Sequence, residues 1–214
     1  MTKMLELKKI FGQNNLFLIS DNHFGHQRMF EKFEPSRQDV SGDFSSFEEE
    51  MRSRWNKTVQ PDDVVLYLGD FCINKRNNKK TIFNIETNTR KLNGRKILIK
   101  GNHDQSPNEL YYKSGWDIVS NRTDLDLAGC IVADICGERV LFSHFGIFIS
   151  NRFNNKYKKQ VDLFGDLYHD HACTINIHGH SHGNAGATHR SYNVSVEKIK
   201  FTPIDIKEII NTLH

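Results

Sequence analysis

An apolar run that ends in a polar cluster, LFLISDNH at residues 16–23, sets the pattern from which the fold is predicted. Four later stretches end in the same way: VVLYLGD at 64–70, ILIKGNHD at 97–104, RVLFSH at 139–144 and TINIHGHSH at 174–182. Short continuous apolar runs bounded by Gly and polar residues are typical of strands buried on both faces. The five runs therefore predict five buried strands, each followed by polar side chains.

Helical periodicity appears between and after these runs. Residues 47–59 have apolar side chains at helical spacing, and Ser46 and Glu49 stand in the arrangement of a capping box. Residues 81–92 and 205–213 form two further helix candidates. Strands that alternate with helices predict an α/β domain.

Residues 117–142 have a different pattern, in which short runs are punctuated by Gly129 and Gly137. This pattern suggests antiparallel hairpins, with one turn at Cys136-Gly137-Glu138. The chain is therefore expected to form a mixed sheet or two stacked sheets. A length of 214 residues without a repeat or linker predicts a single domain over residues 1–214. Because ligands gather at the carboxyl ends of strands in open α/β folds, the five polar clusters are expected to converge on one rim.

The composition is that of an ordinary globular protein. Hydrophobic residues make up 37% of the chain, and 29 Lys+Arg against 26 Asp+Glu leave a net charge of +3. This charge suits an enzyme with anionic substrates but is too small to indicate nucleic-acid binding. The four cysteines show no Cys-x-x-Cys pair, and no run reaches the roughly 20 apolar residues of a membrane span. We expect a soluble, cytoplasmic protein with reduced thiols and no membrane partner.

The polar clusters together contain a set of metal ligands without thiolates. The set comprises the carboxylates of Asp21 and Asp70, the amide of Asn102, and the imidazoles of His23, His144, His180 and His182. Nitrogen and oxygen ligands of this kind suit Mn, Fe, Zn, Co or Ni. Seven ligands are too many for one ion with an open position, and they fit two ions that share a bridging carboxylate.

The spacing of these ligands supports a shared site. In Asp-x-His and His-x-His the two ligands share one face of a regular strand, or converge on a metal from a tight loop. The glycines before Asp70, Asn102 and His180 are expected to allow sharp turns that aim the ligands inward.

Taken in order, these motifs resemble the signature of calcineurin-like metallophosphoesterases. The motifs are Asp21-Asn22-His23, Gly69-Asp70, Gly101-Asn102-His103-Asp104, His144 and Gly179-His180-Ser181-His182. The opening SDNHFGH also resembles a subgroup of small bacterial and phage phosphoesterases. One departure is Ser143, which stands where the family often has Gly before the histidine. The resemblance implies two packed mixed β-sheets flanked by helices, an αββα sandwich.

Carried over residue by residue, the resemblance implies a role for each motif residue. One metal ion would be held by Asp21, His23, Asp70 and His182. The second would be held by Asp70, Asn102, His144 and His180. His103 would face the scissile phosphate, stabilise its charge and protonate the leaving oxygen, and Asp104 would orient His103.

These inferences predict a dinuclear metal-dependent hydrolase of phosphate esters, with Mn favoured over Fe, Zn, Ni or Co. Two cations about 3.5–4 Å apart lower the pKa of a bridging water, and the resulting hydroxide attacks phosphorus in line. Phosphodiesters are favoured over monoesters, because a monoester carries more charge and the sequence does not clearly provide extra cationic clamps. The expected substrate is a small phosphate ester or nucleotide. The sequence does not indicate an oligomeric state.

Two other functions are compatible with the same motifs. A nuclease acting on DNA or RNA would need a basic groove and strongly salt-dependent affinity. A catalytically silent metal-binding scaffold would have lost ligands or the histidine of the third motif, whereas all ligand positions and His103 are present.

Several residues outside the motifs have two interpretations each. His26 is either a substrate contact or a loop histidine, and His178 is expected to be buried along its strand. His169 and His171 are expected at a solvated helix end or loop, and His189 in a surface loop or at the substrate.

Aromatic and basic residues near the rim are similarly open. Phe24, Phe30 and Phe33 are expected to pack a loop, with base stacking as the alternative. The stretch Lys156-Tyr157-Lys158-Lys159 is expected to be an exposed helix face rather than a nucleic-acid contact. Candidates for a phosphate clamp, each more often a solvated surface charge, are Arg28, Arg37, Lys75, Arg76, Arg152 and Arg190.

Overall fold

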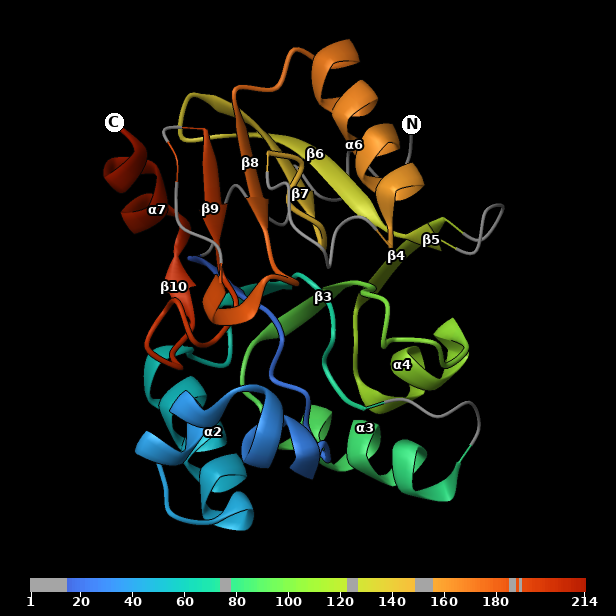
Figure 1. Ribbon diagram of the computed structural model, residues 1–214, viewed down its shortest axis with the longest axis vertical. Coiled ribbons are helices and arrows are strands. Elements are labelled where there is room, and N and C mark those ends of the chain that lie inside the picture. Colours follow the sequence, from blue (N-terminus) through green and yellow to red (C-terminus); the bar gives the residue numbers. More distant parts are fainter. Residues whose placement is uncertain (1–14, 74–77, 123–126, 149–155, 185–187, 189) are drawn as a thin grey trace.

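Two β-sheets pack against each other, and helices cover their outer faces (Figure 1). The computed structural model describes residues 15–73, 78–122, 127–148, 156–184, 188 and 190–214. The predicted sandwich of two mixed sheets between helices is confirmed.

The first sheet has six strands in the order β10-β1-β2-β3-β4-β5. These are β1 (Leu16–Ile19), β2 (Val64–Tyr67), β3 (Arg95–Ile99), β4 (Ile118–Arg122), β5 (Leu127–Ala128) and β10 (Ile204–Asp205). Strands β1 to β4 run parallel, and β5 and β10 pair antiparallel at the two edges. The first three predicted strands thus become neighbours, so the polar clusters that follow them lie at one end of the sheet.

The second sheet has four strands in the order β6-β7-β8-β9. They are β6 (Cys130–Ile135), β7 (Glu138–Ser143), β8 (Ile175–His178) and β9 (Ser191–Asn193). Strands β7, β8 and β9 are parallel, whereas β6 and β7 form the predicted antiparallel hairpin. Its turn contains Cys136 and Gly137 with φ of 53° and 85°, the left-handed conformation that two-residue hairpin turns require.

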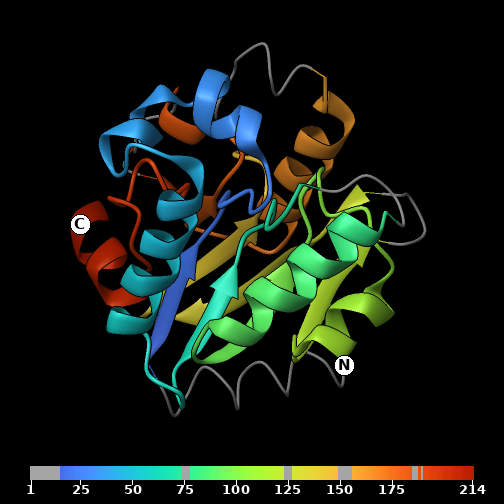
Figure 2. The same ribbon diagram turned by 90° about the horizontal axis from the view of Figure 1, so that it is seen from below.

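Helices flank both sheets. They are α2 (Phe44–Thr58), α3 (Lys79–Lys91), α4 (Asn108–Ser114), α6 (Lys158–Asp170) and α7 (Ile206–Leu213), with short helical turns η1 (Met29–Phe33), η2 (Pro35–Asp39) and η3 (His182–Asn184). Helices α2, α3 and α4 lie on the outer side of the six-stranded sheet, and α6 lies over the four-stranded sheet (Figures 1 and 2). No described helix is both long and apolar enough to cross a membrane.

The start of α2 corrects one prediction. The helix begins at Phe44, and its N-cap is Asp43, whose carboxylate accepts a hydrogen bond from the backbone N–H of Ser46 at 3.0 Å. Ser46 therefore lies inside the helix and is not the cap. Asp is as good an N-cap as Ser, so the earlier carboxylate adds most of a turn. The predicted helices at 81–92 and 205–213 correspond to α3 and α7.

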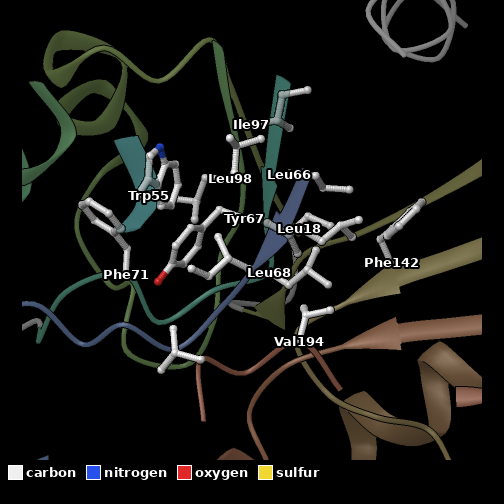
Figure 3. Close-up of a cluster of buried hydrophobic side chains, with 14 of the residues drawn as sticks. Leu18, Trp55, Leu66, Tyr67, Leu68, Phe71, Ile97, Leu98, Phe142 and Val194 are labelled. Atoms are coloured by element: carbon white, nitrogen blue, oxygen red, sulfur yellow. The ribbon is translucent and has the colours of Figure 1, made fainter. Parts of the chain in front are cut away.

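The core lies between the two sheets and extends under α2. Figure 3 shows Leu18 and Leu66 of the first sheet facing Phe142 of the second sheet and Val194, which directly follows β9, with Trp55 of α2 alongside. All five side chains are at most 1% exposed. Burial of this many apolar side chains fixes both sheets relative to each other, and it thereby fixes the loops at the strand ends.

Candidate metal centre

The polar clusters after β1, β2, β3, β7 and β8 converge between the two sheets, as predicted. Two groups of three side chains lie there, and within each group the metal-binding atoms are all within 4.8 Å of one another. We call Asp21, His23 and His182 the first group, and Asp70, His144 and His180 the second group. Each group combines one carboxylate with two imidazoles, a mixture that first-row divalent metals accept.

The backbone at the ligands explains how residues two apart meet at one point. Five of the ligand residues have positive φ, between 47° and 67°: Asp21, His23, Asp70, His180 and His182. Residues other than Gly seldom adopt this conformation, and such strain clusters at functional sites. The Asp-x-His and His-x-His motifs therefore converge as tight loops and do not share the face of a strand.

Asp21 presents one oxygen to the protein and the other to the first group. Its Oδ2 accepts hydrogen bonds from Ser20 Oγ at 2.6 Å, the backbone N–H of His180 at 2.9 Å and Ser195 Oγ at 3.0 Å. Its Oδ1 is buried without a hydrogen-bond partner among the described residues. Oδ1 lies 3.9 Å from His23 Nε2 and 4.0 Å from His182 Nε2. Two atoms that each bind a metal at about 2.0–2.2 Å are separated by at most about 4.4 Å, so these spacings fit one ion.

Asp70 belongs to the second group and also lies beside the first group. Its Oδ1 accepts a hydrogen bond from the backbone N–H of His103 at 2.8 Å. Its Oδ2 lies 3.6 Å from Nε2 of His23 and 3.5 Å from Nε2 of His144. One carboxylate oxygen is thus equally close to a histidine of each group, which is the geometry that a bridging ligand requires.

The histidines of the second group have their free nitrogens turned inward. His144 Nδ1 donates to the carbonyl of Leu68 at 2.7 Å, and Nε2 faces the amide oxygen of Asn102 at 3.1 Å. Burial opposes charge on His144, but Asp70, Asp21 and the Leu68 carbonyl together outweigh burial and raise the pKa to about 9. A cation is therefore favoured among these acceptors, and a metal ion can supply it in place of a proton. Burial lowers the pKa of His180 to about 2, so the ring is neutral, and its Nε2 has no hydrogen-bond partner among the described residues.

The glycines before the ligands have two different roles. Gly69 has a φ of +94° and makes the sharp turn that was predicted. Gly101 and Gly179 do not have this conformation. A Cβ on Gly101 would lie 2.8 Å from Asp70 N, and one on Gly179 would lie 2.6 Å from Asp21 Oδ2. At these two positions Gly allows neighbouring loops to approach closely, which brings the ligands of different strands together.

The family model of calcineurin-like phosphoesterases matches residues 15–205. The chain belongs to the calcineurin-like phosphoesterase family. An uncharacterized protein of Methanocaldococcus jannaschii is 26% identical over 213 residues, which cover 95% of this chain and 93% of that protein.

A solved structure has the same fold. The crystal structure of a protein of unknown function from Aquifex aeolicus has a TM-score of 0.71 at 24% identity, and the match covers 94% of this chain and 100% of that chain. A structure described as a novel archaeal phosphodiesterase has a TM-score of 0.39 at 12% identity over 90% of this chain and 98% of that chain. The second likeness is too distant to indicate function.

Asp104 has contacts that differ from those the family resemblance implied. Its buried carboxylate accepts backbone hydrogen bonds from Asp70 at 2.6 Å, Gly101 at 2.9 Å and Phe71 at 3.2 Å. Burial raises its pKa to about 6, and Asp70 adds to this effect. None of its described hydrogen bonds goes to the His103 ring. Asp104 therefore ties the loop after β2 to the loop after β3, and so positions Asp70.

His103 lies at the open side of the centre. Its ring is half-buried and stands edge-on to the ring of His23, with 5.1 Å between the centroids. It belongs to neither ligand group. That His103 faces a bound phosphate stays a prediction.

Two important residues were not recognised in the sequence as partners of the centre. Glu197 accepts hydrogen bonds from Arg37 at 2.6 and 2.9 Å, and His182 Nδ1 lies 3.3 Å from its carboxylate. Arg37 also donates to the carbonyls of Asp21 and Asn22 at 2.6 and 2.8 Å. Their side chains are only 1% and 3% exposed, so the suggested use of Arg37 as a substrate clamp is wrong.

The charges of this pair act on His182. Burial works against ionisation of Glu197, but Arg37 and His182 outweigh it and lower the pKa of Glu197 to about 2. Burial likewise disfavours charge on His182, but Glu197 outweighs it and raises the pKa to about 9. A carboxylate on the outer nitrogen of a metal-binding histidine fixes the ring and strengthens it as a ligand. In the sequence, the signal that could have indicated Glu197 as a partner of the centre is its place directly after the stretch that contains Val194 and Val196.

The remaining histidines and thiols follow the predictions where the structure describes them. His178 is fully buried with Nδ1 at 2.8 Å from the carbonyl of Gly179, and His169 and His171 are exposed at the end of α6. The four cysteines, Cys72, Cys130, Cys136 and Cys173, are free. Lys75, Arg76, Arg152 and His189 lie outside the described residues.

Proposed function

We propose that this family member hydrolyses phosphate esters with the help of two divalent metal ions, and that it prefers phosphodiesters. The observation that carries the proposal is the position of Asp70 Oδ2, within 3.6 Å of a histidine from each ligand group. Unpartnered atoms converge on the same region, namely Asp21 Oδ1, His23 Nε2 and His180 Nε2 among the described residues. Buried polar atoms are rarely left unsatisfied in proteins, so these atoms indicate a bound cation.

The residues present fit two ions. The first group together with Asp70 would hold one ion, and the second group together with Asn102 would hold the other. When bound, such ions supply an activated water and neutralise charge on the phosphoryl oxygens. We propose Mn as the resident metal, and the nitrogen and oxygen donors also suit Fe, Zn, Ni and Co.

The chain itself contributes a positioned histidine and a neutral amide. The backbone N–H of His103 is anchored on Asp70 Oδ1, which directs the half-buried ring toward the space beside His23. There the imidazole would stabilise charge on the phosphoryl group and give a proton to the leaving oxygen. Asn102 adds no negative charge, so an anionic phosphate meets less repulsion.

The preference for diesters follows from the cationic side chains. Arg37 is a candidate clamp that contacts the backbone of the Asp21 loop, but Glu197 and two backbone carbonyls occupy its guanidinium. A monoester dianion therefore gains nothing from Arg37. A diester carries a single negative charge and has less need of such a clamp.

Metal reconstitution tests this proposal. The protein is stripped with chelator, reloaded with Mn, Ni, Zn, Fe or Mg in turn, and assayed with bis(p-nitrophenyl) phosphate and p-nitrophenyl phosphate. We expect turnover that depends on the added metal and is faster for the diester. Absence of turnover in protein that binds two ions would contradict hydrolysis and favour the metal-binding scaffold.

A substitution at His103 tests its role separately. His103→Ala is expected to lower turnover by about 10²-fold, the lower range for loss of a general acid, and to leave both ions bound. The matched control is His171→Ala, because His171 is an exposed histidine at the end of α6. Loss of a metal ion from His103→Ala would show that His103 is a ligand, and would refute the role proposed here.

A further inference from the structure

Three phenylalanines follow the first ligands in sequence, and one of them differs from the others. Phe24 and Phe30 are 1% and 5% exposed, so they do not stack on a ligand, and they join the core rather than only packing a loop. Phe33, the last residue of η1, is 53% exposed. Phe33 contacts the loop residues His26 and Arg28, but more than half of its side chain is exposed, which is compatible with the alternative of a stacking contact.

A continuous row of rings joins Phe33 to the metal centre. The ring of His26 lies 5.5 Å from the ring of the ligand His23, 6.2 Å from that of His103 and 6.2 Å from that of Phe33. His26 thus stands between the site of the phosphate and the exposed phenylalanine. A group attached to a phosphate at the centre would reach Phe33 by passing over His26.

A cationic side chain accompanies this row. The guanidinium of Arg28 lies over the Phe33 ring at 5.3 Å from the centroid, a cation–π contact that holds the ring in place. Arg28 is exposed, so its charge is available to an anionic ligand. In addition, His26 Nδ1 is buried and has no hydrogen-bond partner in the part of the chain that the structure describes.

Exposure alone would not distinguish Phe33. Phe83, Tyr112 and Phe148 are 65%, 43% and 41% exposed, and single apolar side chains on a surface are common. Phe33 differs because its ring contacts lead to a candidate ligand and to His103. An exposed aromatic ring that His26 connects to a phosphate site matches a nucleotide, which has a planar base and an anionic phosphate.

We propose that Phe33, Arg28 and His26 form a subsite that stacks a nucleobase, and that the substrates are esters of nucleotides. This inference rests on the proposed function, because the metal centre is what holds the phosphate. Stacking of a base on an aromatic side chain tolerates different bases, since every base has a π face. The subsite therefore selects nucleotides as a class and does not select one base.

Binding of two matched phosphates tests the subsite without any turnover. Adenosine 5′-monophosphate and ribose 5-phosphate differ only in the base, and their affinities for the metal-loaded protein are measured by titration calorimetry. We expect about tenfold tighter binding of the nucleotide, within the range that one stacked base contributes. Phe33→Ala should remove this preference for the nucleotide, whereas Phe33→Trp, which keeps an aromatic ring at this position, should retain it. The matched control is Phe83→Ala, which removes an exposed phenylalanine of α3 and should keep the preference.

The outcomes separate the two proposals. Equal affinities in the wild-type protein, or a preference that survives in Phe33→Ala, would overturn the subsite. A preference that depends on Phe33 supports the subsite even if no diester is hydrolysed with any metal, in which case the proposed hydrolysis alone fails. If the protein hydrolyses diesters but does not prefer the nucleotide over ribose 5-phosphate, the proposed hydrolysis holds and the subsite alone fails.

Discussion

The two ligand groups have similar ligands but different surroundings. Behind the first group lies a buried ion pair, in which Glu197 contacts His182 and Arg37 binds the backbone of the Asp21 loop. Behind the second group no ion pair contacts a histidine among the described residues: His144 Nδ1 donates to the neutral Leu68 carbonyl, and the Asp104 carboxylate accepts from the backbone N–H of Asp70. The first group also has a carboxylate of its own in addition to Asp70. We therefore expect the first ion to bind more tightly than the second, because opposite charges attract strongly where water is excluded.

The largest effect is expected at the residue that both groups share. Asp70→Asn removes the charge between the two ions, so both should bind more weakly and turnover should fall by at least about 10²-fold. Loss of a residue that only hydrogen-bonds to a ligand lowers metal affinity or activity by roughly 10–100-fold, and loss of a bridging ligand is expected to cost more. Metal content and the temperature of unfolding of the metal-free protein are measured together. Full occupancy of both ions in a folded Asp70→Asn protein would refute the bridge.

A change at Glu197 should separate the two groups. Glu197→Gln keeps an acceptor for His182 but removes the charge, so the affinity of one ion should fall by roughly 10–100-fold while the other changes little. The isolated charge of Arg37 should also lower the free energy of unfolding by about 3–5 kcal/mol. Calorimetric titration of the metal-free protein and denaturant unfolding measure the two effects.

Glu50→Gln provides the matched control for this change. Glu50 is 38% exposed and forms an i,i+4 ion pair with Arg54 on α2. Exposed pairs of this kind contribute about 0.3–0.5 kcal/mol, so neither ion should be affected. If Glu197→Gln weakened both ions equally, the difference in surroundings would have no bearing on affinity.

The parts of the fold that the sequence predicts well are those that depend on local patterns. The run at 16–19 predicts β1 to the residue, because a parallel strand buried on both faces has to be apolar throughout. The two-residue strand β10 and the seven-residue helix α4 are too short to show a period. The partner of each strand also depends on long-range packing, so the division into two sheets rested on the family resemblance.

The same distinction holds for the centre. All seven proposed ligands lie in short motifs at strand ends, which made them visible in the sequence. Glu197 is 15 residues from His182 and 160 residues from Arg37, and no spacing rule connects them. Likewise, the family resemblance implied that Asp104 orients His103, but backbone amides of two loops occupy the Asp104 carboxylate. Contacts made by the tertiary structure decide the partners of a side chain.

A smaller effect is expected at the second group. Asn102→Ala removes the neutral oxygen that lies 3.1 Å from His144 Nε2, and the second ion should bind about tenfold more weakly. The first ion should keep its affinity, since Asn102 has no described contact with the first group. The same titration reports both steps. Loss of the tighter step instead would place Asn102 with the other ion and reverse the assignment of the two groups.

The smallest effect is expected at a single hydrogen bond behind Asp21. Ser195 Oγ has one proton and two acceptors, Asp21 Oδ2 at 3.0 Å and Asn193 Oδ1 at 2.7 Å, whereas Ser20 Oγ and the His180 N–H also donate to Asp21 Oδ2. Ser195→Ala should therefore cost about 1 kcal/mol, or roughly fivefold in the affinity of the first ion alone. The comparison variant is Ser143→Ala, because Ser143 is equally buried but donates to the Phe145 carbonyl. It should leave the first ion unchanged. If Ser195→Ala also leaves the affinity of the first ion unchanged, the two remaining donors suffice to hold Asp21. The surroundings of the first group would then act through the charge of Glu197 and not through hydrogen bonds to the Asp21 carboxylate.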